Sequence, residues 1–405
     1  MQYAFLSTLI PNTMQKEVTR FSSNNMQDAA NALQWHIYNG LCKNLNDKIE
    51  LINILPVGSY PQYYKKAFIK EEIFQTDYSE NNLNVGFCNI KLLRKFIQPV
   101  KIYKALKKWC KKNQDDKFLF MYTVSSAFMK AAAKIKKKYP DIKICAVVAD
   151  LPDMSSLSSK KGFLQKIFEK KLSSDSYSRL NCIDAFVLLT KYMAEYMKIN
   201  KPFCVVEGIA SEIDNAEEKE KNNKLKNILY TGTLHKKFGI LNLLEAFKQI
   251  PDNDYRLIIC GIGDSEDIIK KAAEEDSRII YKGQLSREEI LVLQRKAAVL
   301  VNPRQANEEF TKYSFPSKNL EYLSSGTPVI AYKLEGIPDE YDPYIFYVKD
   351  NSTESLKDKL TEVCECSDGI VYEKSQKAKE FVLKNKNEVA QTKIIIDMLK
   401  KEKLM

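Results

Sequence analysis

The residues best suited to chemistry lie in one short segment of the second half, Phe315-Pro316-Ser317-Lys318-Asn319-Leu320-Glu321. The segment predicts the start of a helix, because Pro316 suits a first helical turn and Ser314 can cap it. Helical spacing puts Glu321 about one turn beyond Ser317 and Lys318, on the same side. A lysine and free backbone N–H groups suit a phosphate, whereas a carboxylate suits sugar hydroxyls. The segment therefore predicts a site for a nucleotide sugar.

Two glycine-containing turns precede this segment, and each follows a strand-like run. The first is Thr231-Gly232-Thr233-Leu234-His235-Lys236-Lys237-Phe238-Gly239. It leads into a helical pattern, so its glycines, its lysines and the helix start together suit an anionic phosphate. An ordinary strand-to-helix turn with solvated lysines is the alternative. The second turn, Gly261-Ile262-Gly263-Asp264, lacks the third glycine of a dinucleotide-binding motif and is more typical of a tight turn.

Strand-like and helical patterns alternate along the whole chain. The strand-like runs are Tyr3–Ile10, Ile49–Val57, Phe118–Val124, Ile142–Ala149, Ala185–Leu189, Ile228–Thr231, Arg256–Cys260, Arg278–Tyr281, Val299–Val301, Pro328–Ala331 and Ile345–Val348. The helical patterns include Met26–Leu41, Ser125–Lys138, Leu241–Gln249, Glu266–Glu275 and Ser286–Lys296. Such alternation predicts parallel sheets that are covered by helices on both faces.

The alternation breaks at Ser211–Lys226, where a charged stretch predicts a solvated linker. We therefore expect an α/β protein of two doubly wound, Rossmann-like domains, residues 1–208 and 225–385, which face each other across a cleft. The last helical pattern lies in residues 386–405, and we expect it to dock back on the first domain. Ligands of such sheets bind beyond the carboxyl ends of the strands, so the strand-end motifs of the second half carry most weight.

Composition excludes several classes of protein. The 405 residues are 44% hydrophobic, which excludes wholesale disorder. No apolar run approaches the roughly 18 residues that a membrane span needs, and the first residues predict a strand rather than a signal peptide. Nine cysteines without a C-x-x-C pair indicate reduced thiols in a cytoplasmic protein. With only two histidines, His36 and His235, zinc hydrolases and most histidine-based acid/base enzymes are excluded.

Positive charge is concentrated in the first half. The formal net charge is +11, and residues 1–205 carry 32 Lys and Arg against 17 Asp and Glu. Two stretches, Lys91–Lys112 and Lys160–Leu172, combine lysines with apolar residues at helical spacing. Their apolar faces contain Phe96 and Trp109 in the first stretch and Phe163 and Phe168 in the second. Such helices suit an anionic membrane surface, whereas a packed helix with solvated lysines is the alternative. No motif or aromatic platform for nucleic acid accompanies them.

The stretch from Ile228 to Val348 resembles the donor-binding domain of the family 4 glycosyltransferases, which have the B-type fold. The resemblance rests on the Thr-Gly-Thr-Leu turn, the Gly-Ile-Gly loop, Tyr281-Lys282-Gly283-Gln284-Leu285, Val301-Asn302-Pro303-Arg304, the Phe315–Ala331 block and Gly336-Ile337-Pro338-Asp339-Glu340. The first half is similar more loosely, through Asp150-Leu151-Pro152-Asp153 and Leu189-Thr190-Lys191-Tyr192-Met193.

The resemblance implies roles for individual residues. Glu321 matches the second glutamate of the family's E-x7-E motif, which holds the nucleotide ribose, while Ser317 and Lys318 match groups that meet the donor diphosphate. The position of the first glutamate is Tyr313 here, and Glu308 or Glu309 is the alternative contact to the sugar.

In the first turn, the positions at which family members carry Arg and Lys are Thr233 and Phe238, so Lys237 is the expected phosphate contact. The resemblance thus implies a donor-binding set of Gly232, Thr233, Gly261, Gly263, Gln284, Leu285, Tyr313, Ser317, Lys318 and Glu321.

The resemblance also implies a retaining transferase of surface-polysaccharide or glycolipid assembly. It would move a hexosyl or N-acetylhexosaminyl group from a nucleoside-diphosphate sugar, with a UDP-sugar favoured, to a glycan or lipid-linked acceptor. Lys237 and Lys318 would stabilise the departing diphosphate without a metal or other cofactor. Asp150 ends a buried strand and is expected to meet an acceptor hydroxyl or the donor sugar, or else to cap a turn.

Other interpretations of the sequence remain open. Asp252-Asn253-Asp254 has the D-x-D pattern of a metal clamp, but it precedes its strand, so we interpret it as a surface turn. A nucleotide-sugar epimerase of the same fold and a non-catalytic binding partner are the alternative functions. We expect the protein in the cytoplasm, peripheral at the inner face of the cell membrane.

Overall fold

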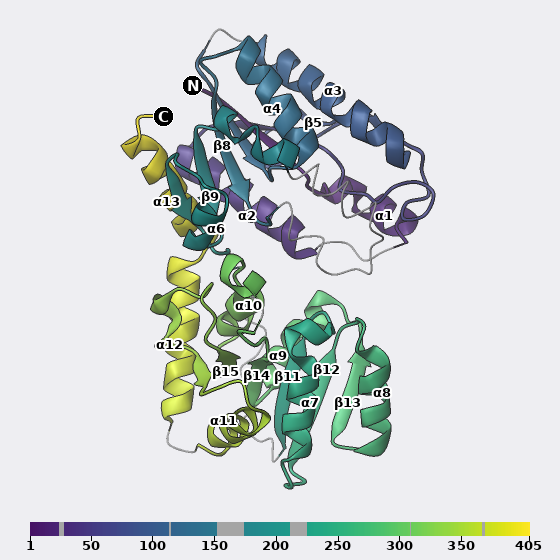
Figure 1. Cartoon of the computed structure of the whole chain (residues 1–405), viewed down its shortest axis with the longest axis vertical. Helices are drawn as coiled ribbons and strands as arrows, with labels where there is room; N and C mark the ends of the chain where they lie inside the picture. The colour runs from purple at the N-terminus through teal and green to yellow at the C-terminus, as the bar shows by residue number, and fades with distance from the viewer. Residues whose placement is uncertain (24–27, 113–114, 152–173, 211–224, 308, 367–368) are drawn as a thin grey trace. The chain divides into compact units, whose positions relative to one another are not determined.

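The computed structural model describes residues 1–23, 28–112, 115–151, 174–210, 225–307, 309–366 and 369–405. These residues form two compact units (Figure 1), Met1–Ile209 together with Glu388–Met405, and Ala210–Asn387. The basic stretch Lys160–Leu172 and most of the charged stretch Ser211–Lys226 lie outside the described residues. Each unit is an α/β fold around its own sheet of mostly parallel strands, which confirms the predicted pair of doubly wound domains.

The first unit is built on an eight-stranded sheet in the order β10-β9-β8-β7-β1-β2-β5-β4. Its strands are β1 (Gln2–Ser7), β2 (Ile49–Asn53), β4 (Glu72–Phe74), β5 (Asn82–Asn84), β7 (Lys117–Tyr122), β8 (Lys143–Val148), β9 (Ala185–Leu188) and β10 (Phe203–Val205). All neighbouring strands pair in parallel except β4 and β5, which are antiparallel. A separate two-stranded ribbon joins β3 (Phe68–Ile69) to β6 (Phe87–Cys88).

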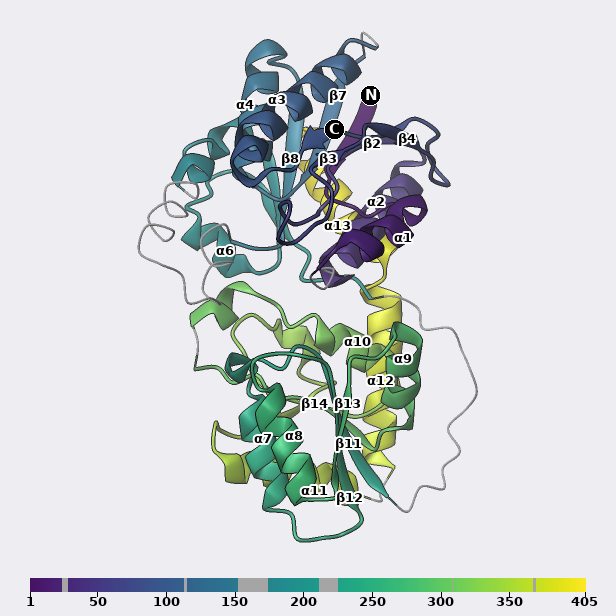
Figure 2. The same cartoon turned by 90° about the vertical axis from the view of Figure 1, so that its right-hand side faces the viewer.

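Helices cover both faces of this sheet. The helices are α1 (Asn12–Phe21), α2 (Asp28–Leu45), α3 (Lys91–Cys110), α4 (Ser126–Lys138), α6 (Lys191–Tyr196) and α13 (Glu388–Lys401). Figure 2 shows α3 and α4 on one side of the central strands and α2 with α13 on the other. The central strands are almost wholly apolar because both of their faces are buried, as in β7 with the sequence Lys-Phe-Leu-Phe-Met-Tyr.

The C-terminal helix α13 packs against α2 in the first unit. The two backbones come so close at Gly40 that a Cβ there would lie 2.2 Å from the carbonyl oxygen of Glu388. Glu388 also pairs with His36 at 3.1 Å and with Lys43 at 2.6 Å. Apolar residues of α13, Ile395 and Leu399 among them, complete the core on this face.

The second unit contains a fully parallel sheet in the order β13-β12-β11-β14-β15-β16. Its strands are β11 (Lys226–Thr231), β12 (Tyr255–Cys260), β13 (Ile279–Gly283), β14 (Val299–Asn302), β15 (Val329–Tyr332) and β16 (Phe346–Val348). The helices are α7 (Ile240–Lys248), α8 (Glu266–Glu275), α9 (Arg287–Lys296), α10 (Lys318–Ser324), α11 (Thr353–Glu365) and α12 (Ile370–Asn385). In Figure 2, α7, α8 and α11 lie on one face of the sheet, and α9, α10 and α12 on the other.

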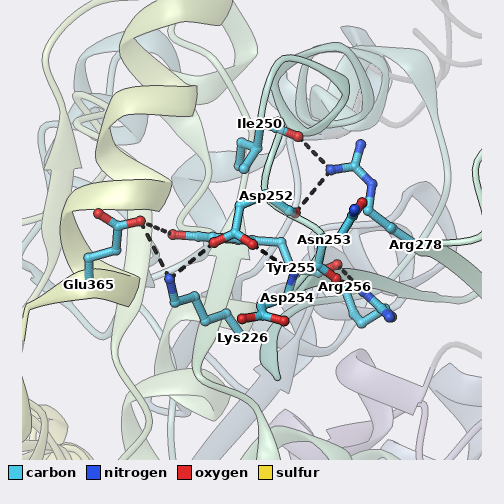
Figure 3. A network of polar contacts seen from close by, with 9 residues as sticks. All are labelled: Lys226, Ile250, Asp252, Asn253, Asp254, Tyr255, Arg256, Arg278 and Glu365. Carbon is cyan, nitrogen blue, oxygen red and sulfur yellow. Dashed lines mark hydrogen bonds and ion pairs between the residues drawn. The ribbon is translucent and has the colours of Figure 1, made fainter. Parts of the chain in front are cut away.

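A polar network fixes the amino ends of β11 and β12 (Figure 3). Lys226 bridges Asp252 at 3.5 Å and Glu365 at 3.4 Å, and the hydroxyl of Tyr255 donates to Glu365 at 3.0 Å. Asp252 also accepts a hydrogen bond from the backbone N–H of Asp254 at 2.8 Å. The Asp252-Asn253-Asp254 segment is therefore the turn that the sequence predicted, with its first carboxylate engaged by the protein itself.

Some apolar residues of helix α3 are buried and others are exposed to solvent, which corrects one prediction. We expected Trp109 beside Phe96 on a membrane-facing side, but Trp109 is only 2% exposed, whereas Phe96 is 75% exposed. Helix α3 packs against α4, and Trp109 is one of the buried residues of its carboxyl-terminal half. The amino-terminal half leaves Leu92, Leu93 and Val100 exposed together with Phe96. None of the helices in the described part of the chain is long and apolar enough to cross a bilayer.

Candidate functional site

The chain order of the second sheet defines where a ligand is expected. From the central strand β11 the chain adds β12 and β13 on one side, and then returns to add β14 on the other. The loops after β11 and β14 therefore leave the sheet in opposite directions, and ligands of doubly wound folds bind at such a point. These two loops carry Gly232 to Gly239 and Pro303 to Gln305.

The loops after β11 and β12 are held in direct backbone contact. Leu234 N–H donates to the carbonyl of Ile262 at 2.9 Å, and Ser265 N–H donates to that of Leu234 at 3.0 Å. At Gly261, with φ of 131°, a Cβ would lie 1.8 Å from the carbonyl oxygen of Gly232. Only glycine permits this approach. At Gly263 a Cβ would lie 2.5 Å from the carbonyl group of Leu234. Gly261 and Gly263, which were expected to contact the donor, therefore allow the backbones of the two loops to pack closely.

Lys318 and Glu321 lie together beside the first loop, as the sequence predicted from their spacing. The ammonium of Lys318 is 3.8 Å from the carboxylate of Glu321. A Cβ on Gly232 would lie 2.9 Å from Cε of Lys318, so the glycine leaves room for the lysine stem. The absence of a side chain at Gly232 thus allows Lys318 to lie over the loop.

Glu321 is oriented by a residue that the sequence analysis did not single out. The side-chain amide of Gln294 donates to Glu321 at 2.5 Å and to the hydroxyl of Thr231 at 3.2 Å. The hydroxyl of the buried Tyr322 in turn accepts from Thr231 N–H at 2.9 Å. Glu321 keeps 29% of its side chain exposed, so it is positioned by Gln294 and still open to a ligand.

The start of α10 differs from the prediction in one respect. Ser314 does not cap this helix, because its hydroxyl donates to the carbonyl of Phe310 at 3.1 Å and accepts from Arg304 at 2.6 Å. Ser317 occupies the N-cap position instead, without a side-chain capping bond, and it is exposed.

Two cations share a pair of aromatic rings at the loops after β11 and β14. The ammonium of Lys237, in the 3-10 helix η3 (Lys236–Phe238), lies 5.1 Å from the Phe238 ring centre and 5.5 Å from that of Phe310. The guanidinium of Arg304 lies over the same rings, at 5.8 and 4.4 Å. Arg304 was not predicted as a site residue, although its place directly after a strand end is a signal for one.

The remaining predicted donor residues occupy nearby loops. Thr233 and Gln284 are exposed, while Leu285 packs partly against the core. The hydroxyl of Tyr313 lies 3.4 Å from the carboxylate of the exposed Glu309, in the 3-10 helix η4 (Glu309–Tyr313). Glu309 thus lies beside Tyr313, the residue at the position of the first glutamate, and Glu308 lies outside the described residues.

In the first unit, candidate acceptor residues follow the carboxyl ends of β7 and β8. Asp150 follows β8 and is exposed, although nearby protein partly desolvates its carboxyl and raises its pKa. Thr123 follows β7 and has φ of 78°. This conformation is strained for a β-branched residue and is often found at functional sites. No group of His, Cys, Asp and Glu able to hold a metal occurs in the described parts of either unit.

The two Rossmann-like units have the B-type fold that glycosyltransferases adopt, as the similarity to solved structures shows. Residues 211–403, which include α13 and all of the second unit except Ala210, match the family model of the glycosyl transferases group 1. This confirms the resemblance found in the sequence.

Individual proteins agree with this assignment. An uncharacterized glycosyltransferase, MJ1069 of Methanocaldococcus jannaschii, is 25% identical over 45% of this chain and 47% of that protein, so the match spans about half of the relative's length. Among solved structures, sucrose-phosphate synthase from Thermosynechococcus elongatus is similar over 100% of both chains, with a TM-score of 0.66 and 12% identity. Anabaena Alr3699/HepE in complex with UDP is similar over 99% of this chain and 100% of that one, with a TM-score of 0.61 and 12% identity.

Proposed function

We propose that this protein is a retaining glycosyltransferase that moves a sugar from a UDP-sugar to a glycan or lipid-linked acceptor. The observation that carries the proposal is the arrangement of Lys318 and Glu321 beside the Gly232 loop, with Glu321 held by Gln294. A lysine suits the diphosphate, and an oriented, partly exposed carboxylate suits the ribose hydroxyls. The solved structure of HepE with UDP, which has the same fold, supports a uridine nucleotide.

The proposed chemistry depends on charge stabilisation rather than on a dedicated base. When the bond between the sugar and the diphosphate breaks, negative charge develops on the leaving phosphate oxygen. Lys237 and Lys318 would stabilise that charge in the way that a metal ion does in other transferases. In a front-face reaction the same phosphate oxygen accepts the proton of the acceptor hydroxyl, which leaves Asp150 to orient the acceptor.

The function is tested by turnover of a panel of UDP- and GDP-sugars in the presence of EDTA. We expect one UDP-sugar to be hydrolysed slowly without acceptor, at a rate that EDTA does not change, because lysines take the place of a cation. In Lys318→Ala the rate should fall about 100-fold, the typical effect of removing one charge-stabilising group.

Loss of turnover in EDTA and recovery with Mn²⁺ or Mg²⁺ would contradict the metal-independent mechanism. Conversion of the UDP-sugar to its epimer would identify an epimerase instead. Binding of UDP-sugars without hydrolysis, and without transfer to any glycan or lipid-linked acceptor offered, would identify a non-catalytic partner.

We also propose that the first unit contacts an anionic membrane at the inner face of the cell membrane. The amino-terminal half of α3 exposes Leu92, Phe96 and Val100, at 69%, 75% and 44% of their accessible surface. Farther along the same helix, Lys101, Lys104 and Lys108 are exposed and form no ion pair with any described residue. Apolar side chains on a basic helix suit the boundary between lipid headgroups and acyl chains.

Vesicle co-sedimentation tests this contact. The protein should bind vesicles that contain anionic lipid at low salt, and most of the binding should disappear in 1 M salt, where charges are screened within about 3 Å. Phe96→Ser should remove the fraction that resists salt, whereas Trp109→Phe, a change at a buried position of the same helix, should leave binding unchanged. A protein that stays in the supernatant with anionic vesicles at low salt would show that the lysines only face solvent.

A further inference from the structure

Arg304 is a buried cation that lacks an anion in the structure. Its side chain is 8% exposed, and its guanidinium donates a single hydrogen bond, to the hydroxyl of Ser314 at 2.6 Å. Its Nε is buried without any hydrogen-bond partner. Arg304 forms no ion pair with any residue that the structure describes. Burial lowers the pKa of Arg304 to about 10, so the side chain still carries its charge at neutral pH.

The neighbours of Arg304 increase the local positive charge rather than balance it. Lys237 lies over the same two rings, Phe238 and Phe310, as the guanidinium does. Like Arg304, Lys237 forms no ion pair with the described residues. Aromatic faces attract a cation, but a buried charge normally has an opposite charge beside it.

The position of Arg304 in the fold indicates where the missing anion comes from. Arg304 follows β14 and Lys237 follows β11, and these neighbouring strands flank the point at which the chain order of the sheet reverses. The two loops touch, because a Cβ on Gly239 would lie 1.8 Å from the carbonyl oxygen of Pro303. A ligand at this point of the sheet is therefore close to both cations.

We propose that Arg304 receives an anionic group of the donor, so that its unbalanced charge is neutralised when the nucleotide sugar binds. The inference rests on the proposed donor site. The chemistry required is a pair of neighbouring oxyanion atoms, which the planar guanidinium can bind with two parallel hydrogen bonds. Two sources have this chemistry, the diphosphate of any donor and the carboxylate of a uronic acid sugar.

Binding of four probes to the full chain separates these sources. The probes are pyrophosphate, UDP, UDP-glucose and UDP-glucuronic acid, and their affinities are measured by calorimetry for the natural protein and for Arg304→Met. If Arg304 binds the diphosphate, the variant should bind UDP at least about tenfold more weakly. If Arg304 binds a sugar carboxylate, only the affinity for UDP-glucuronic acid should fall.

Thermal unfolding without ligand gives a second readout. If Arg304 only stabilised the fold, its replacement would lower the Tm. Arg304→Met removes an unbalanced buried charge, so its Tm should equal or exceed that of the natural protein. The matched control is Arg94, a partly buried arginine that lies over Phe87 at 5.3 Å but donates to the carbonyl of Val57 and to Asn89. Arg94→Met should lower the Tm and leave all four affinities unchanged.

The conservative variant Arg304→Lys keeps the charge without the planar fork. It should recover most of the affinity for a diphosphate, to which a point charge suffices, but little of that for a carboxylate. This variant also decides the question if Arg304→Met does not fold. Affinities for all four probes within about twofold of the natural protein, with UDP still bound, would overturn the role of Arg304 alone. A natural protein that binds none of the probes would overturn the proposed donor site as well.

Discussion

Glu321→Ala is expected to weaken the binding of UDP at least about tenfold, because a carboxylate that accepts both ribose hydroxyls contributes about 1.5–3 kcal/mol. The loss should be direct, since Glu321 is partly exposed and is already oriented by Gln294 at 2.5 Å. The fold should survive, because Gln294 keeps its bond to the hydroxyl of Thr231. Isothermal calorimetry with UDP measures the effect, and circular dichroism verifies folding.

A matched variant makes this result specific. Glu245 lies on α7 of the same unit and pairs at 3.5 Å with Lys248, three residues away, much as Glu321 does with Lys318. Glu245→Ala should therefore leave the affinity for UDP unchanged. If Glu321→Ala binds UDP as tightly as the natural protein does, the ribose is bound elsewhere, and the main support for the proposed donor site is lost.

Gly239→Ala is expected to have the largest effect on stability, because it combines backbone strain with a steric clash. Gly239 precedes α7 with φ of 78° and ψ of 10°, in the left-handed region. A Cβ there would lie 1.8 Å from the carbonyl oxygen of Pro303. The conformation alone costs about 1–2 kcal/mol, and overpacking adds about 1–3 kcal/mol. Since Pro303 precedes Arg304, the displaced loop should also weaken UDP binding.

Gly369 provides a control in which a substitution causes backbone strain but no steric clash. Gly369 precedes α12 with φ of 71° and ψ of −16°, but a Cβ there would have no atom within 4 Å. Gly369→Ala should cost only the conformational part, about 1–2 kcal/mol, and leave UDP binding unchanged. Urea unfolding of both variants gives the comparison. If both variants lose the same free energy of unfolding, the loops after β11 and β14 can move apart without destabilising the protein.

The regular elements could be predicted because they leave a periodic pattern. Each apolar run that was expected to form a strand contains one, from β1 to β16, since parallel strands that are buried on both faces must be apolar throughout. The pairs β3 with β6 and β4 with β5 were not expected, because strands of two or three residues are too short to show a period.

The site could be predicted only as far as it depends on local sequence. Helical spacing was enough to bring Lys318 and Glu321 together. It could not show that Gln294, 27 positions earlier, would orient the carboxylate, because that contact joins two different helices, α9 and α10. Burial was also invisible in the sequence, and so Arg304 was overlooked and Trp109 was placed on the wrong side of α3.

The packing of α13 on α2 has a consequence for the order in which the protein can be completed during synthesis. The first unit closes with Glu388–Met405, so the ribosome makes the whole of Ala210–Asn387 before the last helix of the first unit exists. Until then the surface of α2 that includes Ile37 and Leu41 lacks Ile395 and Leu399, against which it packs in the finished core. The nascent first unit therefore exposes an apolar face for the whole time that the second unit is being synthesised, and this interval is when it would most need a chaperone.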